Sequence, residues 1–204
     1  MRIAVFASGG GSNFQSIVDA TENKSLDASV VLCVASKPNI GVIDRADNHN
    51  IPVFVLSGPI EDNMKELMQV LDVHQVTFIA LAGFLRKIPN KLIAAFPDRI
   101  VNIHPALLPA FGGPGMYGMH VHRAVIKSGA AESGATVHFV DEDYDSGPVI
   151  LQSKVMVEPG DTPDTLAHRV LEAEHALYPN ALQLFATGRI QKNGPRTFTI
   201  NSQI

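Results

Sequence analysis

Short apolar and β-branched runs alternate with helical patterns from the first residue onwards, and this alternation constrains the fold more than any other feature. Residues 3–7 (IAVFA) have the pattern of a buried strand, and a glycine-rich turn then leads into a helical pattern from about Asn13. Parallel strands need long crossover connections, which are usually helices. The alternation therefore predicts an α/β protein with a mostly parallel sheet that helices cover on both faces.

The remaining elements follow the same alternation. We expect further strands at residues 30–35, 53–56, 76–82, 99–104, 135–140 and 149–157, and helices at 41–49, 62–73, 90–96, 120–127 and 162–186. The most apolar strand, 76–82, should be central, and the last two strands should be antiparallel neighbours. The long helix should be interrupted or restart at Pro179, and the tail, 189–200, is expected to form one final strand. Without repeats or polar linkers, residues 1–204 are predicted to form a single domain.

Composition excludes several classes of protein. Of the 204 residues, 46% are hydrophobic and 18% charged, which excludes intrinsic disorder and a coiled coil. The formal net charge of −4 gives no basic excess for nucleic acid or a membrane surface. The single cysteine, Cys33, allows no internal disulfide and is interpreted as a buried small hydrophobe. Because the chain opens on a strand and has no apolar run near ~18 residues, we predict a soluble, cytoplasmic protein.

The first strand is followed by the segment ASGGGSN, residues 7–13. A glycine turn at the start of a helix presents backbone N–H groups and the positive end of the helix dipole, which suits a phosphate. Ser12 and Asn13 add donors and are candidates to cap the helix. The segment is neither a Walker A loop nor a complete G-x-G-x-x-G, because Phe14 replaces the third glycine. It predicts a site for a single phosphate group, with a plain tight turn as the alternative.

The strand at 99–104 ends in Asn102-Ile103-His104-Pro105. Residues two apart on a strand point to the same side, so the Asn102 amide and the His104 imidazole should be neighbours. They lie at the carboxyl end of the strand, where open α/β sheets bind their ligands. An amide donor beside a titratable imidazole can stabilise a developing oxyanion. The alternative is a structural histidine at the end of a strand.

An acidic segment, DEDYDSGP at residues 141–148, joins the last two expected sheet strands. It does not match a calcium loop. A carboxylate from this segment that reached His104 would hold the imidazole and raise its pKa. The spacing does not choose which of the four carboxylates does so, and a solvated acidic turn is the alternative.

Other histidines and acids do not form a metal motif. His120 and His122 are two residues apart on an expected helix, so their side chains diverge. Glu172, Glu174 and His175 are not arranged as H-E-x-x-H. We therefore expect no metal. Together the glycine loop, the Asn102–His104 pair and the acidic loop indicate a transferase that acts on a phosphorylated substrate.

Five segments carry a resemblance to a known family: SGGGSN, LAGFLR, NIHPALLP, HFVDEDYDSGPVILQ and EHALYP. Essentially end to end, the chain resembles the phosphoribosylglycinamide formyltransferase family of the folate-dependent formyltransferase superfamily. The resemblance implies a three-layer, mostly parallel, Rossmann-like sheet of about seven strands. It also implies transfer of the formyl group of 10-formyltetrahydrofolate, a co-substrate, to the amine of N1-(5-phospho-β-D-ribosyl)glycinamide in de novo purine (IMP) biosynthesis, by a monomer or homodimer.

The resemblance also implies roles for particular residues. Asn102, His104 and Asp145 would form the catalytic trio, with Asp145 keeping His104 protonated. The ribonucleotide would contact Gly11, Ser12, Asn13, Leu171, Glu172, Ala173 and Glu174. The folate would contact Leu85, Arg86, Lys87, Ile88, Asn102, Asp141, Glu142, Asp143, Tyr144 and Asp145.

Two features of this chain differ from many relatives. The loop after LLP is longer, with FGGPGMYGMHVH in place of a shorter segment, and its role at 110–119 stays open. A basic residue that some relatives use near the folate tail corresponds to Ile60. The alternatives are a formyltetrahydrofolate hydrolase or sugar-nucleotide formyltransferase, and a non-catalytic nucleotide-binding module. Hydrolases normally carry an additional N-terminal domain and tRNA-directed relatives a C-terminal one, and neither is expected here.

Overall fold

Seven strands form one sheet in the order β3-β2-β1-β4-β5-β6-β7 in the computed structural model, which describes residues 1–194 and 197–200. This confirms the predicted fold class, and the apolar strand β4 (Phe78–Leu81) is central as expected. The chain divides into two compact units, unit 1 (Met1–Asn102) and unit 2 (Ile103–Ile204), and the division falls within β5 (Ile100–His104). That the whole chain forms a single domain stays a prediction.

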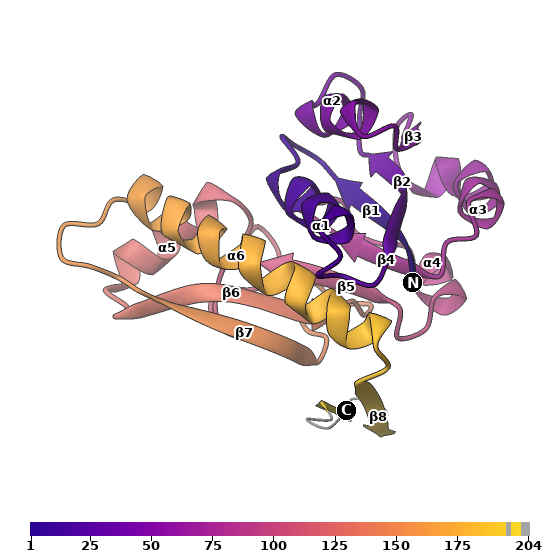
Figure 1. Cartoon of the computed structure of the whole chain (residues 1–204). Helices are drawn as coiled ribbons and strands as arrows, with labels where there is room; N and C mark the ends of the chain where they lie inside the picture. Colours follow the sequence, from indigo (N-terminus) through magenta and orange to yellow (C-terminus); the bar gives the residue numbers. More distant parts are fainter. Residues whose placement is uncertain (195–196, 201–204) are drawn as a thin grey trace. The chain divides into compact units, whose positions relative to one another are not determined.

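Unit 1 is built from strand–helix alternation, with all four of its strand pairs parallel. Besides β4 and the first part of β5, its elements are β1 (Arg2–Ala7), α1 (Ser12–Glu22), β2 (Ser29–Ala35), α2 (Gly41–Asn48), β3 (Val53–Val55), η1 (Glu61–Asn63), α3 (Met64–Val73) and α4 (Asn90–Ala95). The helices α1 and α2 both contact β2 (Figure 1). The last five residues of β1 are fully buried, which explains why this strand is a continuous apolar run. Cys33 is also buried, as predicted, and burial raises the pKa of its thiol to about 12.

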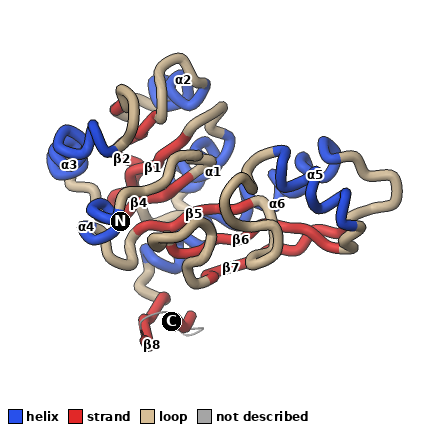
Figure 2. Tube along the Cα trace, turned by 180° about the vertical axis from the view of Figure 1, so that it is seen from behind, coloured by secondary structure: helices blue, strands red, loops and turns tan. Residues whose placement is uncertain are grey.

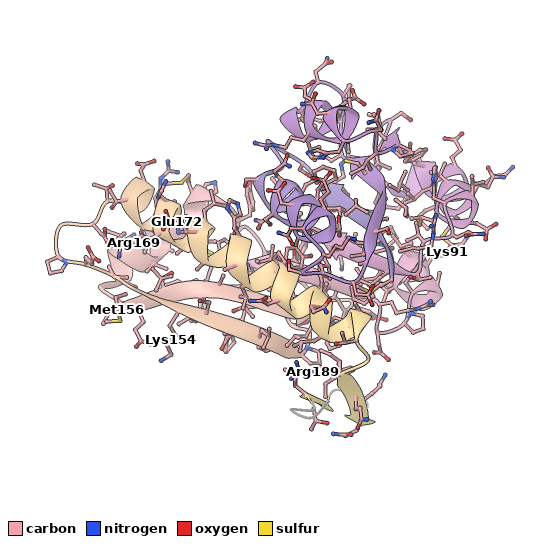
Figure 3. The ribbon with its side chains drawn as sticks, in the orientation of Figure 1. Lys91, Lys154, Met156, Arg169, Glu172 and Arg189 are labelled. Carbon is pink, nitrogen blue, oxygen red and sulfur yellow. The ribbon has the colours of Figure 1, made fainter. Side chains whose placement is uncertain are left out.

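Unit 2 contains an antiparallel strand pair covered by a long helix. Its elements are α5 (Met119–Ser128), β6 (Glu132–Phe139), β7 (Val149–Met156), α6 (Pro163–Ala186), β8 (Ile190–Gly194) and β9 (Thr197–Ile200). The antiparallel pairing of β6 with β7 confirms the prediction, and the two strands run side by side in Figure 2. The helix α6 contacts both strands (Figure 1). Exposed and half-buried residues alternate along most of β7, and its exposed Lys154 and Met156 are labelled in Figure 3.

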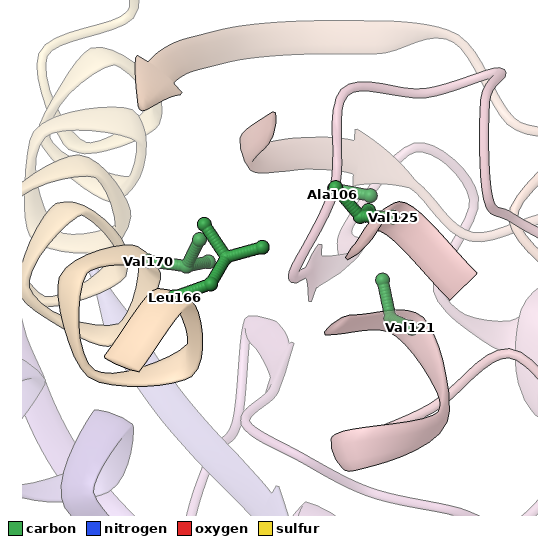
Figure 4. Packing of buried hydrophobic residues seen from close by; sticks show 5 residues of the cluster. All are labelled: Ala106, Val121, Val125, Leu166 and Val170. Atoms are coloured by element: carbon green, nitrogen blue, oxygen red, sulfur yellow. The ribbon is translucent and has the colours of Figure 1, made fainter. Parts of the chain in front are cut away.

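A small apolar cluster connects the helices of unit 2 to the loop that follows β5 (Figure 4). Leu166 and Val170 of α6 pack with Val121 and Val125 of α5 and with Ala106, and all five are fully buried. Burial of one large aliphatic side chain stabilises a fold by about 1.5–3 kcal/mol. The cluster therefore fixes the beginning of the loop that leads to α5.

Two expectations about the end of the chain are wrong. The helix α6 is continuous through Pro179, because Tyr178, Ala181 and Leu182 on both sides of the proline are fully buried and their packing offsets the lost backbone hydrogen bond. The tail forms the antiparallel hairpin β8–β9 rather than one strand. Its first strand ends at Asn193-Gly194, a dipeptide that favours turns.

No helix in the described part of the chain has the length and apolarity needed to cross a bilayer.

Candidate active site

The glycine loop of unit 1 connects β1 to α1 and is held mainly through its backbone. Ser8 donates its N–H to the carbonyl of Gly83 (3.1 Å), and its hydroxyl accepts the N–H of Leu85 (3.0 Å). The carbonyl of Gly9 accepts the N–H of Val42 at 3.1 Å. The loop is thus fixed by two segments that are distant in sequence, the start of α2 and the loop after β4.

Gly11 is the N-cap of α1 and has a left-handed conformation, with φ of +76°. A Cβ at this position would lie 2.7 Å from Cγ2 of Val42, so both the dihedral angle and the space require glycine. No side chain caps the helix. The expectation that Ser12 or Asn13 caps it is therefore wrong, because the turn that Gly11 makes places both residues inside the first turn of the helix. The Asn13 side chain is buried.

The loop after β4 carries the residues that were predicted to contact folate, and its side chains alternate between core and solvent. Phe84 and Ile88 are buried. The ring of Phe84 packs edge-on against that of Phe6, with 5.3 Å between the ring centroids. Leu85 is 54% exposed, and Lys87 is also exposed. Arg86 donates to the backbone carbonyls of Ser36 and Gly58. The Arg86 guanidinium therefore holds three loops of unit 1 together.

Asn102 and His104 both lie on β5, separated by one residue. Asn102 is half-buried, whereas only 3% of His104 is exposed. Strand geometry places the two residues on the same face of β5. This is the arrangement that the N-x-H-P pattern predicts.

Within unit 2, His104 lies beside Asp145. The distance from Nδ1 of His104 to Oδ2 of Asp145 is 3.5 Å, and 11% of the Asp145 side chain is exposed. The other ring nitrogen of His104, Nε2, lies 2.8 Å from the carbonyl oxygen of Phe111. Because a carbonyl oxygen only accepts, Nε2 carries the hydrogen. The backbone N–H of Gly113 donates to Oδ2 of Asp145 at 2.9 Å, so the loop at 111–113 contacts both members of the pair.

The acidic loop turns one carboxylate inward and leaves the others near solvent. Glu142, Asp143 and Tyr144 are exposed. Oδ1 of Asp141 accepts a hydrogen bond from the hydroxyl of Ser146 at 2.6 Å. Asp145 has a φ of +54°, a conformation that non-glycine residues rarely adopt. The structure therefore distinguishes Asp145 from its acidic neighbours, which the spacing of the sequence did not.

A second close approach fixes the base of the acidic loop. The carbonyl of Pro148 accepts the N–H of Phe139 at 3.0 Å, and a Cβ on Gly147 would overlap the carbonyl oxygen of Phe139. Only glycine fits at this position. The D-x-G pattern thus combines an inward carboxylate with the glycine that lets its loop close.

The segment between β5 and Phe111 is held by polar side chains of β6 and β7, of which Thr136 is fully buried. The hydroxyl of Thr136 donates to the carbonyl of Ala106 (2.6 Å) and accepts the N–H of Leu108 (3.0 Å). The amide of Gln152 donates to the carbonyl of Leu108 at 2.9 Å. These bonds position the chain that places Phe111 and Gly113 against the His104–Asp145 pair.

Two histidines lie near the pair that the sequence did not assign to the site; His122 was considered there only with His120, as an unsuitable metal ligand. His138 on β6 is buried, and its Nε2 lies 3.6 Å from Oδ1 of Asp145. His122 on α5 is also buried, and its Nδ1 has no hydrogen-bond partner among the described residues. The only sequence signal was the presence of polar Thr136 and His138 two residues apart on an otherwise apolar strand. Such a signal does not show what the side chains face.

Burial has the largest effect on the pKa of His104. The cost of burying a charged imidazole lowers the pKa of His104, and this outweighs the opposing effects of Asp145 and the Phe111 carbonyl; the charge of His138 lowers the pKa further. Asp145 does act to raise this pKa, as expected of a carboxylate beside His104, but burial outweighs it and the pKa is lowered overall. Burial acts to raise the pKa of Asp145, but the hydrogen bond with His138, the charge of His104 and the Gly113 N–H outweigh it and lower that pKa.

The predicted ribonucleotide contacts on α6 differ in exposure. Glu174 is buried, whereas Glu172 is exposed on the helix surface (Figure 3) and lies 3.5 Å from Nδ1 of His168. Leu171 and Ala173 are half-buried. Glu174 is thus the member of this group whose carboxylate the fold removes from bulk water. In unit 1, Ile60, where some relatives have a basic residue, is buried in the core.

Within the residues that the structure describes, no group of three or more His, Cys, Asp and Glu side chains is placed to hold a metal ion. The His104–Asp145 pair is suited instead to hydrogen bonding and proton transfer.

The comparisons with known proteins identify the family. The family model for formyl transferase matches residues 1–182. The chain belongs to the formyl transferase family. Arabidopsis thaliana phosphoribosylglycinamide formyltransferase, chloroplastic, is 47% identical over 195 residues, which cover 93% of this chain and 67% of that protein. Bacillus subtilis phosphoribosylglycinamide formyltransferase is 39% identical, with 89% of this chain and 93% of that protein covered.

A solved structure agrees with these relatives. The crystal structure of glycinamide ribonucleotide transformylase 1 from Symbiobacterium toebii matches with a TM-score of 0.90 and 34% identity, over 98% of this chain and 93% of that one. The formyltransferase fold is therefore shared along nearly the whole chain, including the strands and loops that carry the candidate residues. The predicted roles of individual residues stay predictions.

Proposed function

We propose that this formyltransferase transfers the formyl group of 10-formyltetrahydrofolate to the amine of N1-(5-phospho-β-D-ribosyl)glycinamide, a step of de novo purine biosynthesis. The observation that carries the proposal is the buried His104–Asp145 pair, with Asn102 two residues before His104 on β5. Membership of the family supports the group transferred. The names of the relatives from Arabidopsis and Bacillus support the acceptor.

The ribonucleotide-binding assignment rests on unit 1 and α6. The N–H groups of Gly11, Ser12 and Asn13 would hold the 5′-phosphate, because the start of a helix presents backbone N–H groups and the positive end of the helix dipole to an anion. The buried carboxylate of Glu174 would bind the glycinamide part, where it can accept N–H groups of the substrate. Its neighbours Leu171–Ala173 would line that part of the site.

The folate assignment rests on two loops. The loop at 85–88 offers exposed Leu85 as an apolar surface for the flat pterin ring. The backbone of residues 141–145 would supply hydrogen bonds to its polar edge. The buried position of Ile60 removes it as a contact for the folate tail.

The reaction forms one C–N bond and breaks another. The free amine of the ribonucleotide attacks the formyl carbon, and the carbonyl oxygen becomes an oxyanion. The bond from this carbon to folate N10 then breaks, and one proton moves from the attacking amine to N10. The side-chain amide of Asn102 and Nε2–H of His104 would donate to the oxyanion, which lowers the energy of the tetrahedral intermediate.

The lowered pKa of His104 fits this role in a specific way. Neutral His104 with its hydrogen on Nε2 can already donate a hydrogen bond. An oxyanion beside the ring would favour the protonated imidazole, because an adjacent negative charge raises the pKa of a histidine. Asp145, which keeps its negative charge, would stabilise the imidazolium as it forms. His104 would thus take up a proton from solvent on Nδ1, beside Asp145, when negative charge develops on the substrate, and release it when the intermediate breaks down.

Catalysis also requires a change at Phe111. Its carbonyl accepts the hydrogen of His104 Nε2, the donor that the oxyanion needs. The substrate must therefore displace this carbonyl, so we assign the loop at 110–119 the role of a self-blocking contact.

We further place the enzyme in the cytoplasm as a monomer or homodimer, although the Arabidopsis relative is chloroplastic.

The test is an assay of formyl transfer with 10-formyltetrahydrofolate or a stable formyl-folate analogue, with and without the ribonucleotide. The expected result is deformylation that requires the ribonucleotide and yields its N-formyl product. The variant His104→Ala should abolish it. His120→Ala, which removes an exposed histidine from α5 of the same unit, should not.

Other outcomes would identify the alternatives. Deformylation without the ribonucleotide would show a hydrolase, and turnover with another amine only would show a different acceptor. Binding of the ribonucleotide without any turnover would support a binding module and contradict the proposal.

A further inference from the structure

The helix α2 holds two consecutive carbonyl groups of the glycine loop. The N–H of Val42 donates to the carbonyl of Gly9 at 3.1 Å, and Nε of Arg45 donates to the carbonyl of Gly10 at 2.7 Å. The start of α2 also packs directly on the loop, since a Cβ at Gly41 would lie 3.3 Å from Cα of Gly10. The helix α2 therefore constrains the loop in addition to α1.

These two bonds determine where the N–H groups of the loop point. In a planar trans peptide the C=O and the following N–H point in opposite directions. When the carbonyls of Gly9 and Gly10 face α2, the N–H groups of Gly10 and Gly11 face away from it. Gly9 and Gly10 are exposed, so this part of the loop is open to solvent. The bond from Arg45 thus orients the Gly11 N–H, the first donor of the predicted phosphate site.

The Arg45 guanidinium is itself fixed. Its Nη1 donates to the amide oxygen of Gln15 at 3.1 Å, and the amide nitrogen of Gln15 donates to Asp19 at 2.7 Å. That same nitrogen lies 2.9 Å from Nε2 of His49, whose Nδ1 is 2.7 Å from Glu22. The side chain is therefore held in one geometry by α1 and α2, with the carboxylates of Asp19 and Glu22 at the far end of the network.

We propose that Arg45 is a positioning residue for the phosphate of the ribonucleotide, which orients the peptide between Gly10 and Gly11 and supplies a fixed positive charge behind it. The inference rests on the proposed function of the glycine loop. An anion on the N–H groups of the loop would be stabilised by both effects, since a fixed cation nearby adds to oriented backbone donors. Arginine suits this role better than lysine because its planar fork reaches a carbonyl and an amide at once.

The experiment measures equilibrium binding of ribose 5-phosphate and of ribose to the whole chain by calorimetry, for the wild type, Arg45→Gln and Arg45→Lys. The matched control is Arg2→Gln. Arg2 also donates to a backbone carbonyl of unit 1, that of His74, through Nε (3.1 Å) and Nη2 (2.8 Å), but it lies at the beginning of β1. The control thus removes the same charge and the same kind of bond.

We expect Arg45→Gln to raise the dissociation constant of ribose 5-phosphate about tenfold, because both the oriented peptide and the nearby charge are lost. Arg45→Lys keeps the charge, so its affinity for ribose 5-phosphate should fall only about threefold. The affinity of Arg2→Gln should fall less than about twofold. Higher salt should narrow the difference between wild type and Arg45→Gln, because it screens the guanidinium charge. In the transfer assay, Arg45→Gln should raise the KM for the ribonucleotide and leave that for folate unchanged.

Several results would overturn the inference. One is equal affinity of the wild type and Arg45→Gln for ribose 5-phosphate at low salt. Another is an equal loss in Arg2→Gln, which would make the effect one of general stability, and matched thermal unfolding of the variants guards against this reading. The binding measurement needs no turnover, so it tests Arg45 even if the formyl-transfer assay fails. Failure of wild-type binding itself would count against the phosphate site and this inference together.

Discussion

The glycine loop of unit 1 and the His104–Asp145 pair of unit 2 are built in different ways. The loop is made of backbone groups, and each of its strong constraints is a hydrogen bond to a main-chain atom or a space that only glycine fits. The pair is made of buried titratable side chains whose charge depends on burial and on one another. Backbone N–H groups can bind the permanent charge of a phosphate. Side chains whose pKa responds to the substrate can stabilise a charge that develops only during the reaction. Changes in the first should therefore alter KM, and changes in the second kcat.

The largest effect should come from the pair itself. His104→Ala and Asp145→Asn should each lower kcat by about 10²–10⁴, because each removes a group that stabilises or follows the charge of the transition state. The KM of the ribonucleotide should change little. Steady-state kinetics with both substrates will measure this, and wild-type turnover of Asp145→Asn would contradict the role given to Asp145.

The next effect should come from the glycine that closes the acidic loop. Gly147→Ala places a Cβ on the carbonyl oxygen of Phe139, so we expect a loss of about 3 kcal/mol in the free energy of unfolding and a lower kcat, since Asp145 moves with the loop. Urea denaturation will measure the loss. The control is Gly160→Ala, where φ is +89° but no atom lies within 4 Å of the added Cβ, and the expected cost is only about 1 kcal/mol. An equal loss of unfolding free energy in the two variants would mean that the structure relaxes to remove the overlap with the Phe139 carbonyl oxygen.

A smaller effect, on KM rather than on kcat, is expected for the glycine loop of unit 1. Gly11→Ala should raise the KM of the ribonucleotide about tenfold with a smaller change in kcat, because the added Cβ meets Val42 and the left-handed turn is strained, which misdirects the N–H donors. Gly9→Ala lies in the same loop, has no atom within 4 Å of its Cβ, and should leave the KM unchanged. A change confined to kcat in Gly11→Ala would contradict the assignment of the glycine loop to substrate binding.

Stability should also depend on pH through His122 of α5. The pKa of His122 is lowered because burial, and then the charge of His104, disfavour its protonated form. The unfolded chain therefore binds more protons, and the wild type should lose stability as the pH falls below about 6.5, the ordinary histidine value. His122→Leu removes one such group, so its stability should fall less between pH 8 and pH 5. Urea unfolding at both pH values compares the two, and an identical loss would show that His122 is not penalised by burial.

Sequence reasoning predicted the parts of the site that are encoded locally. The glycine loop follows the first strand directly, and the spacing of Asn102 and His104 places them on one face of a strand whatever surrounds it. The choice of Asp145 required the family resemblance, because four carboxylates in five residues have the same spacing signal. The structure distinguishes them by burial and by the left-handed turn at Asp145.

The parts that were missed depend on contacts between distant segments. The Phe111 carbonyl, the Gly113 N–H and the His138 ring meet the pair only after the loop and β6 have folded, and no local pattern encodes these distances. The same holds for the lowered pKa of His104, which is an effect of burial. Pro179 is the corresponding error in the fold, where the packing of Tyr178 and its neighbours overrode a strong local signal.

The smallest expected effect tests the apolar contact proposed for folate in unit 1. Leu85 is 54% exposed on a loop whose neighbours Phe84 and Ile88 are buried, so Leu85→Ala should leave the free energy of unfolding nearly unchanged. If the pterin covers this side chain, the KM for folate should rise about threefold, which corresponds to part of the apolar surface of a leucine. The KM of the ribonucleotide and kcat should not change. Val73→Ala, which removes a 76% exposed side chain at the end of α3, is the matched control and should alter neither KM. A loss in kcat alone for Leu85→Ala would assign this loop to the chemistry of the reaction rather than to the binding of folate.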